Sequence, residues 1–241
     1  YLDSFSDATR IQEFRVAINA KFGSIPYFSF VLSLNFFLYW GDIRWALILS
    51  ISNAVLFIGH FVSYHNWLDF LFKKHTSWNV EGSKSPNSQI KETIIISGHM
   101  DCVYEFKWWY KLKKLGFIFT FTGSVVIILQ AVLFICIYFL NSDPREFQSG
   151  WSLISYLLLA FLSLTNICMF NMHSNKMVDG AIDNLSGVAI ASDVLKFFSL
   201  DKRLNHIEIR AVSFGSEEVG LRGSTAYAKM LKQEGKENIT V

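Results

Sequence analysis

The sequence predicts an α/β domain with a mostly parallel sheet and flanking helices, interrupted by transmembrane helical hairpins. Two observations carry this prediction. Segments typical of strands and helices alternate along the polar parts of the chain, and that order favours a largely parallel sheet. Between them lie long runs without charged residues, most of them near the roughly 20 apolar residues that a helix needs to cross a bilayer.

The composition is low in charged residues. Charged residues make up 17% of the 241 residues, below the roughly 25% of an average globular domain. The formal net charge of +2 leaves no basic stripe for phosphate contacts, so we expect no nucleic-acid partner. The three widely spaced cysteines, Cys102, Cys136 and Cys168, predict neither a disulfide framework nor a cysteine zinc site.

The N-terminal part predicts an amphipathic segment followed by a hairpin. In the segment of residues 1–24, apolar side chains near helical spacing predict a surface helix over residues 7–23. Residues 25–72 hold two uncharged runs, separated by a tight turn at residues 41–44. We therefore predict a transmembrane hairpin there.

A second hairpin interrupts the α/β domain. Residues 73–116 supply the first part of that domain, including a β-branched run at residues 93–97 that is typical of a central strand. Residues 117–172 contain two further uncharged runs and predict an inserted transmembrane hairpin. Residues 173–241 supply the second part. Its sequence pattern predicts a helix at residues 184–199, a strand at residues 206–214 and a second helix at residues 221–233.

The distribution of lysine and arginine predicts the orientation of this multi-pass membrane protein. Near the apolar runs, these residues gather on the side shared by residues 1–24, 73–116 and 173–241. The opposite side has only Arg44 and Arg145. The positive-inside rule therefore places the α/β domain in the cytoplasm.

Three short clusters carry residues suited to metal chemistry. The first, residues 97–101, follows a predicted strand, where open α/β sheets bind their ligands. Its Asp101 could reach the far ring nitrogen of His99 and fix the tautomer of that ring. The second cluster, residues 179–187, places Asp183 directly before a helix. A carboxylate there serves either as an N-cap or as a bridge between two cations.

The third cluster, residues 214–224, holds the adjacent Glu217 and Glu218. Two adjacent glutamates at a strand end repel each other unless a cation or a proton intervenes. A division of labour is natural, in which one ligates a metal and the other takes a proton from metal-bound water. Singly, each cluster is common in proteins. Together, each beside a strand end or a helix start, they predict a metal site at the sheet edge.

The ordered motifs GHMD, DGAIDNLSGV and FGSEEVGLRGS resemble the co-catalytic zinc aminopeptidases of the MH clan. The motifs of that family are written GHxD, GAxDNxSG and FxxEExGLxGS. The resemblance covers roughly residues 78–100 and 177–235, and it implies a zinc-exopeptidase-like fold with two zinc ions. It also implies roles for five residues. These are zinc ligation by His99, Asp183 and Glu218, with Asp183 between the two ions, orientation of His99 by Asp101, and proton transfer by Glu217 as general base.

The resemblance implies a membrane-bound exopeptidase, most simply an aminopeptidase that hydrolyses N-terminal peptide bonds with a zinc-bound hydroxide. The alternatives are a catalytically silent relative that serves as a receptor or assembly subunit, and another activity of the clan, such as carboxypeptidase or glutaminyl cyclase. The family's remaining Asp and His ligands have no counterpart after Glu218. Because the chain starts at Tyr1 rather than Met and ends at Val241 in a predicted strand, we expect it to be truncated at both ends, with these ligands beyond Val241. With a membrane hairpin between the motifs, we expect peptide substrates near the lipid bilayer.

Overall fold

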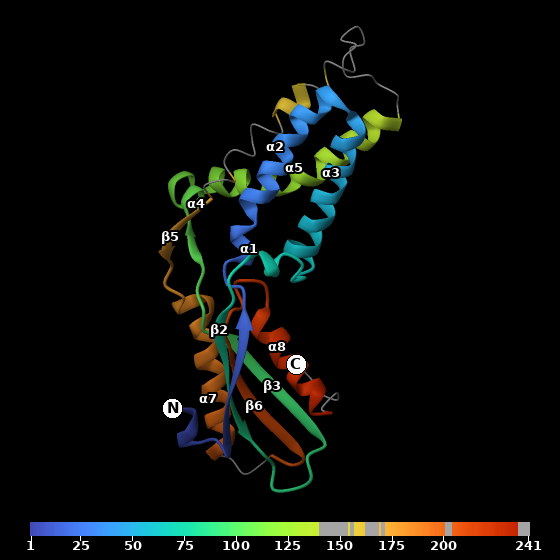
Figure 1. Ribbon diagram of the computed structural model, residues 1–241. Coiled ribbons are helices and arrows are strands. Elements are labelled where there is room, and N and C mark those ends of the chain that lie inside the picture. Colours follow the sequence, from blue (N-terminus) through green and yellow to red (C-terminus); the bar gives the residue numbers. More distant parts are fainter. Residues whose placement is uncertain (140–153, 155–156, 162–168, 170–171, 201–203, 236–241) are drawn as a thin grey trace. The chain divides into compact units, whose positions relative to one another are not determined.

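The computed structural model describes residues 1–139, 154, 157–161, 169, 172–200 and 204–235 (Figure 1). The chain divides into two compact units. We call them the sheet unit and the helical unit. The sheet unit comprises Tyr1–Ile18, Phe72–Val103 and Met177–Val241. The helical unit comprises Asn19–Leu71 and Tyr104–Lys176.

The sheet unit contains a four-stranded sheet in the order β1-β2-β6-β3. Its strands are β1 (Ala8–Val16), β2 (His75–Lys84), β3 (Glu92–His99) and β6 (Ile207–Phe214). The predicted strands at residues 93–97 and 206–214 are confirmed as β3 and β6, and these two pair in parallel. The other two pairings in the described sheet are antiparallel, so the expected mostly parallel sheet is instead a mixed one.

The predicted helix over residues 7–23 is wrong for most of its length. Residues 8–16 form β1, paired with β2 from Ala8 opposite Ser83 to Val16 opposite His75. In the second half of β1, Gln12, Phe14 and Val16 are more buried than the residues between them, as the alternating side chains of a strand require. Backbone pairing with a distant strand thus overrode the local apolar spacing.

Two helices cover opposite faces of this sheet (Figure 1). Helix α7 (Ser186–Leu200) packs against Ile209 and Ala211, whereas helix α8 (Arg222–Gln233) packs against Ile95 and Val212. Ala211 and Val212 are neighbours in β6, and successive side chains of a strand point to opposite faces. The helices predicted at residues 184–199 and 221–233 are confirmed within one or two residues.

The α8 face of the sheet also holds a buried ionic network. Arg210 donates hydrogen bonds to Glu208 at 2.7 and 2.9 Å and lies 3.4 Å from Glu81. Tyr227 of α8 donates to Glu81 at 2.7 Å. Burial raises the pKa of Tyr227, so its hydroxyl stays protonated and keeps donating. The network ties α8 to the two central strands, next to the loop that joins β6 to α8.

The helical unit consists mainly of long apolar helices. The long helices are α2 (Ile25–Gly41), α3 (Ile43–Phe57) and α5 (Lys114–Phe139). The short helix α1 (Ala20–Gly23) precedes α2, and the π-turn η2 (Ile58–Val62) follows α3. Within the described residues, three segments are long and apolar enough to cross a membrane: Ala20–Gly41, Ile43–Val62 and Lys114–Phe139. The predicted turn at residues 41–44 is confirmed, with Asp42 capping α3 by accepting from the Arg44 N–H at 3.0 Å. The second of the two uncharged runs predicted within residues 117–172, at residues 151–172, lies largely outside the described residues.

Polar side chains inside the helical unit join its helices to one another. Asn35 of α2 donates to the Gln130 side chain of α5 at 3.0 Å, and Gln130 donates to the Leu32 carbonyl at 3.0 Å. Asn53 of α3 donates to the Phe28 carbonyl of α2 at 3.2 Å. Many large apolar side chains of these helices are exposed, including Phe30, Phe37 and Val55. Buried amides with apolar outer surfaces are typical of helices packed within lipid.

Short elements complete the described chain. They are η1 (Leu2–Ser4), η3 (Asp69–Leu71), β4 (Tyr104–Phe106), α4 (Lys107–Leu112), β5 (His173–Met177) and η5 (Ala181–Leu185). Strands β4 and β5 form a two-stranded sheet of their own.

Candidate metal centre

The candidate site forms where β3 and β6 end. In the parallel register of these strands, His99 lies opposite Phe214, the last residue of β6. Asp101 follows β3, and Glu217 with Glu218 follows β6. Asp183 lies in η5, directly before α7. The carboxyl ends of two parallel strands and the start of a helix therefore bring all five sequence-predicted residues to one edge of the sheet unit.

Three of these side chains converge closely. One donor atom each of His99, Asp183 and Glu218 lies within 4.8 Å of the other two. The His99 Nε2 atom is 3.3 Å from an Asp183 carboxylate oxygen and 3.6 Å from Glu217 Oε2. The His99 side chain is 9% exposed, whereas that of Asp183 is 80% exposed. The cluster is thus fixed on its histidine side and open to solvent on its aspartate side.

The donor set fits zinc. Zinc binds histidine nitrogen and carboxylate oxygen at about 2.0–2.2 Å in tetrahedral geometry, so two such ligands lie roughly 3.4 Å apart. The 3.3 Å between His99 Nε2 and Asp183 matches that spacing. Histidine and carboxylate donors without cysteine are also typical of catalytic zinc sites, whereas structural zinc sites are usually rich in cysteine.

Asp101 positions the two glutamates through their backbone. One of its carboxylate oxygens accepts the Glu217 N–H at 2.9 Å, and the other accepts the Glu218 N–H at 3.0 Å. The carboxylate is 3.7 Å from His99 Nδ1, whereas the main-chain oxygen of Asp101 is 3.2 Å from the same atom. A proton on Nδ1 shared with that oxygen leaves the Nε2 lone pair for a metal.

The electrostatics of the cluster favour a cation. Burial raises the pKa of Glu218, and the neighbouring charges of Glu217, Asp183 and Asp101 raise it further, while His99 acts in the opposite sense. These carboxylates crowd around a single histidine ring. A divalent cation held by these side chains would offset the mutual repulsion of the four acids.

Asn79 of β2 is a supporting residue that the sequence analysis missed. Its side chain is 1% exposed, donates to the Gly223 carbonyl at 2.9 Å and accepts the Gly215 N–H at 3.1 Å. It therefore clamps both ends of the loop that carries Glu217 and Glu218. The available signal was an asparagine inside a strand, where this residue type is depleted and usually has a specific partner.

Two glycines allow the close approach that places Asp183 beside His99. A Cβ atom at Gly98 would lie 2.5 Å from the Val188 nitrogen and 2.7 Å from the Gly187 carbonyl carbon. A Cβ atom at Gly187 would lie 2.2 Å from the side-chain oxygen of Asn184, which accepts the Gly187 N–H at 3.0 Å. The end of β3 thus packs directly on the first turn of α7.

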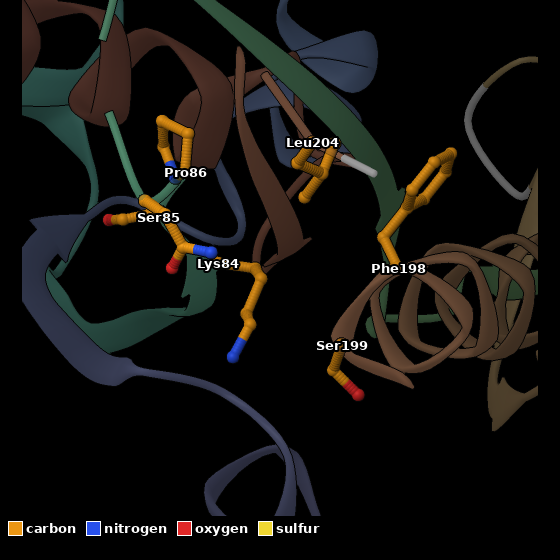
Figure 2. A pocket seen from close by; sticks show the side chains of 7 residues that line it. Lys84, Ser85, Pro86, Phe198, Ser199 and Leu204 are labelled. Carbon is orange, nitrogen blue, oxygen red and sulfur yellow. The ribbon is translucent and has the colours of Figure 1, made fainter. Parts of the chain in front are cut away.

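A separate pocket lies at the opposite edge of the sheet. Figure 2 shows Lys84 and Pro86 on one side, with Phe198 and Leu204 on the other. Lys84 ends β2 and pairs with Ile209, near the start of β6, whereas the metal cluster lies beyond its end. The Lys84 ammonium is paired with Asp7 at 2.5 Å. This pocket is therefore not part of the candidate metal centre.

Comparison with known proteins supports a peptidase. Residues 165–241 match the family model for Peptidase family M28. The match includes Asp183, Glu217 and Glu218, while His99 and Asp101 lie upstream of it. Peptidases of this family are typically zinc-dependent, so the match and the His/Asp/Glu cluster point to the same metal. No curated protein and no solved structure matches the chain.

Proposed function

We propose that the chain carries the metal centre of a membrane-bound, zinc-dependent exopeptidase with aminopeptidase activity. The observation that carries the proposal is the convergence of His99, Asp183 and Glu218 at one sheet edge. Two of these three residues lie in the segment that matches the peptidase family. The proposal thus has support from geometry and from sequence comparison.

In this proposal His99 and Glu218 bind different zinc ions and Asp183 bridges the two. His99 is suited to this role because it is buried and its Nε2 faces the carboxylates. Asp183 is suited to bridging because a carboxylate has two oxygens, and its side chain is largely exposed. Bound zinc would lower the pKa of a coordinated water and polarise the carbonyl of the scissile bond.

Glu217 is the proposed general base. Its Oε2 atom is 3.6 Å from His99 Nε2, so it lies beside the cluster without belonging to the closest set of donors. Its side chain is 30% exposed, and its backbone is held by Asp101. Glu217 can thus take a proton from the attacking water and return it to the leaving amine, while Glu218 remains a ligand.

The proposed setting is a membrane, with the peptidase part on the cytoplasmic side. The three long apolar segments of the described chain and their exposed apolar side chains support the membrane. The distribution of lysine and arginine supports the cytoplasmic side. Short stretches of chain join Asp101 to β4 and β5 to Asp183. We therefore propose that the substrates are peptides, including those with hydrophobic ends, that reach the site near the bilayer surface.

The test uses the full-length protein in detergent, with leucine-arylamide as substrate. Glu217→Gln keeps the size of the side chain but removes the base. We expect kcat to fall by roughly 100-fold or more, since general-base catalysis contributes about 10²–10⁴. Zinc content should stay that of the wild type. Glu13→Gln, an exposed change in β1, is the matched control and should leave both values unchanged.

The other outcomes separate the alternatives. Bound zinc without turnover in the wild type would contradict the aminopeptidase proposal and favour another reaction of the clan or a silent relative. Equal activity in Glu217→Gln and wild type would contradict the base assignment alone. Absence of metal from the active wild-type protein would contradict the zinc proposal itself.

A further inference from the structure

A basic and aromatic segment directly precedes α5. We call residues 107–114, with the sequence KWWYKLKK, the basic collar. It contains four lysines and three aromatic residues, and no acidic residue. Helix α4 forms most of it, Lys113 ends that helix with a positive φ of 50°, and α5 begins at Lys114. The collar is therefore continuous with a helix that is apolar enough to cross a membrane.

One side of the collar is anchored in the helical unit. The Trp108 ring packs in an apolar cluster with Phe22 and Ile25. A Cβ atom at Gly116 would lie 1.9 Å from the Trp108 carbonyl oxygen, so α4 lies directly against the first turn of α5. Trp109 donates its ring N–H to the Thr120 hydroxyl of α5 at 3.0 Å. These contacts hold the collar at one end of the apolar helix.

The other side of the collar is exposed. Lys111, Lys113 and Lys114 are exposed, Tyr110 is 75% exposed, and Trp109 is 40% exposed. Cations and amphipathic rings thus lie together, at the point where the charged chain gives way to an uncharged helix. Aromatic rings with a polar edge are enriched at headgroup depth, and lysine stems can lie along apolar surface while the ammonium stays in water.

We propose that the basic collar binds anionic phospholipid headgroups at the membrane surface where α5 enters the bilayer. The charge of the collar is complementary to such headgroups, because the three exposed lysines lie within four residues of one another. The apolar side chains beside the lysines also favour a lipid. Leu112 and Leu115 are exposed and would contact the acyl chains. Those leucines would contribute nothing to the binding of a free soluble anion.

The inference rests on the proposal that α5 spans a membrane, and it is independent of the peptidase chemistry. Each lysine near an anionic surface strengthens binding by about fivefold. Three together are therefore expected to favour an anionic over a zwitterionic lipid by roughly 100-fold at low ionic strength. The effect should weaken with added salt, because exposed charges are screened.

The experiment is a lipid titration of the full-length protein in detergent, followed by native mass spectrometry. Phosphatidylglycerol is compared with phosphatidylcholine. The combined substitution Lys111→Gln, Lys113→Gln and Lys114→Gln is expected to weaken phosphatidylglycerol binding at least about tenfold and leave phosphatidylcholine unchanged. The control substitution Lys196→Gln, Lys229→Gln and Lys232→Gln removes equal charge from exposed positions of α7 and α8. It should leave phosphatidylglycerol binding as in the wild type.

A second variant set guards against a folding artefact. The combined substitution Lys111→Arg, Lys113→Arg and Lys114→Arg keeps the charge and should retain the preference for phosphatidylglycerol. Equal affinity of the wild type for the two lipids would overturn the proposal, as would an equal loss in the control variant. Displacement of phosphatidylglycerol by a similar concentration of inorganic phosphate would also overturn it, since the site would then bind a free anion. Zinc content and peptidase activity are separate readouts, and failure of those leaves this inference standing.

Discussion

At the level of single residues, hydrogen bonds to the backbone shape the candidate site as much as the donor atoms do. The motifs indicated His99, Asp183 and Glu218 for metal binding, and the structure brings these side chains together. The motifs did not indicate that the Asp101 carboxylate holds the backbone of Glu217 and Glu218. Sequence spacing suggests which side chains can meet, but it carries no information about which backbone N–H groups face them.

Asn79 provides a test at this level. Replacing it by alanine leaves the Gly215 N–H and the Gly223 carbonyl without their buried partner. An unsatisfied buried group costs about 1–3 kcal/mol, so we expect Asn79→Ala to lower the free energy of unfolding by at least that amount. The loosened loop should also weaken zinc binding, by roughly ten- to hundredfold. Chemical unfolding and zinc titration measure the two effects.

Gln12→Ala is the matched control for this change. It removes the third partner of Asn79, whose amide also donates to the Gln12 side chain at 2.8 Å, and the bond that Gln12 donates to the Ala226 carbonyl of α8 at 3.0 Å. Both contacts of Asn79 to the loop stay in place. We expect its zinc affinity to stay close to that of the wild type. If Asn79→Ala bound zinc as tightly as Gln12→Ala, the clamp would have no part in shaping the site.

At the level of elements, local patterns predicted the parts that carry the motifs. The β-branched run of β3 and the apolar faces of α7 and α8 have periodicities that a short window reveals. Strand β1 was misjudged because Ile11 and Phe14 also fit a helical spacing. Its pairing with β2 joins residues 59 to 75 positions apart in the chain, a non-local contact that no short sequence window contains. Together with the antiparallel pairing of β2 with β6, this contact makes the described sheet mixed rather than mostly parallel.

The packing of β3 on α7 predicts a sharp effect of one methyl group. In Gly98→Ala the new Cβ would meet backbone atoms of Gly187 and Val188 at 2.5–2.7 Å, and backbone cannot rotate away as a side chain can. Overpacking of this kind costs typically about 1–3 kcal/mol. We expect this loss in the free energy of unfolding, with weaker zinc binding as Asp183 moves from His99.

Gly41→Ala is the matched control for the glycine prediction. Nothing lies within 4 Å of the Cβ atom that it would add at the end of α2. Its stability should therefore be equal to or slightly above that of the wild type. Equal stability of Gly98→Ala and Gly41→Ala would show that β3 and α7 separate easily, contrary to the close approach described here.

At the level of the whole molecule, composition predicted where the long apolar helices lie. Uncharged runs gave the long apolar helices, because hydropathy depends on local composition alone. The interhelical hydrogen bond between Asn35 and Gln130 was not predictable, since it depends on how two distant helices pack. The grouping of residues 104–116 with the helical unit has the same origin, because the contacts of Trp108 are tertiary.

The two proposed sites lie in different units. The sheet unit contains every residue of the candidate metal centre, from β3, η5 and the loop after β6. The helical unit contains the apolar segments and the basic collar. A metal centre in one unit and a proposed lipid-binding surface in the other can therefore be tested separately, each with the full-length protein and its own set of variants.

The most direct test of the central claim is the metal content of the full-length protein after removal of free zinc. Asp183→Ala removes a carboxylate from the cluster, and Asp179→Ala removes an exposed one four positions earlier. We predict bound zinc in the wild type and in Asp179→Ala, with at least one ion lost in Asp183→Ala. No zinc in the wild type, or full zinc content in Asp183→Ala, would contradict the account.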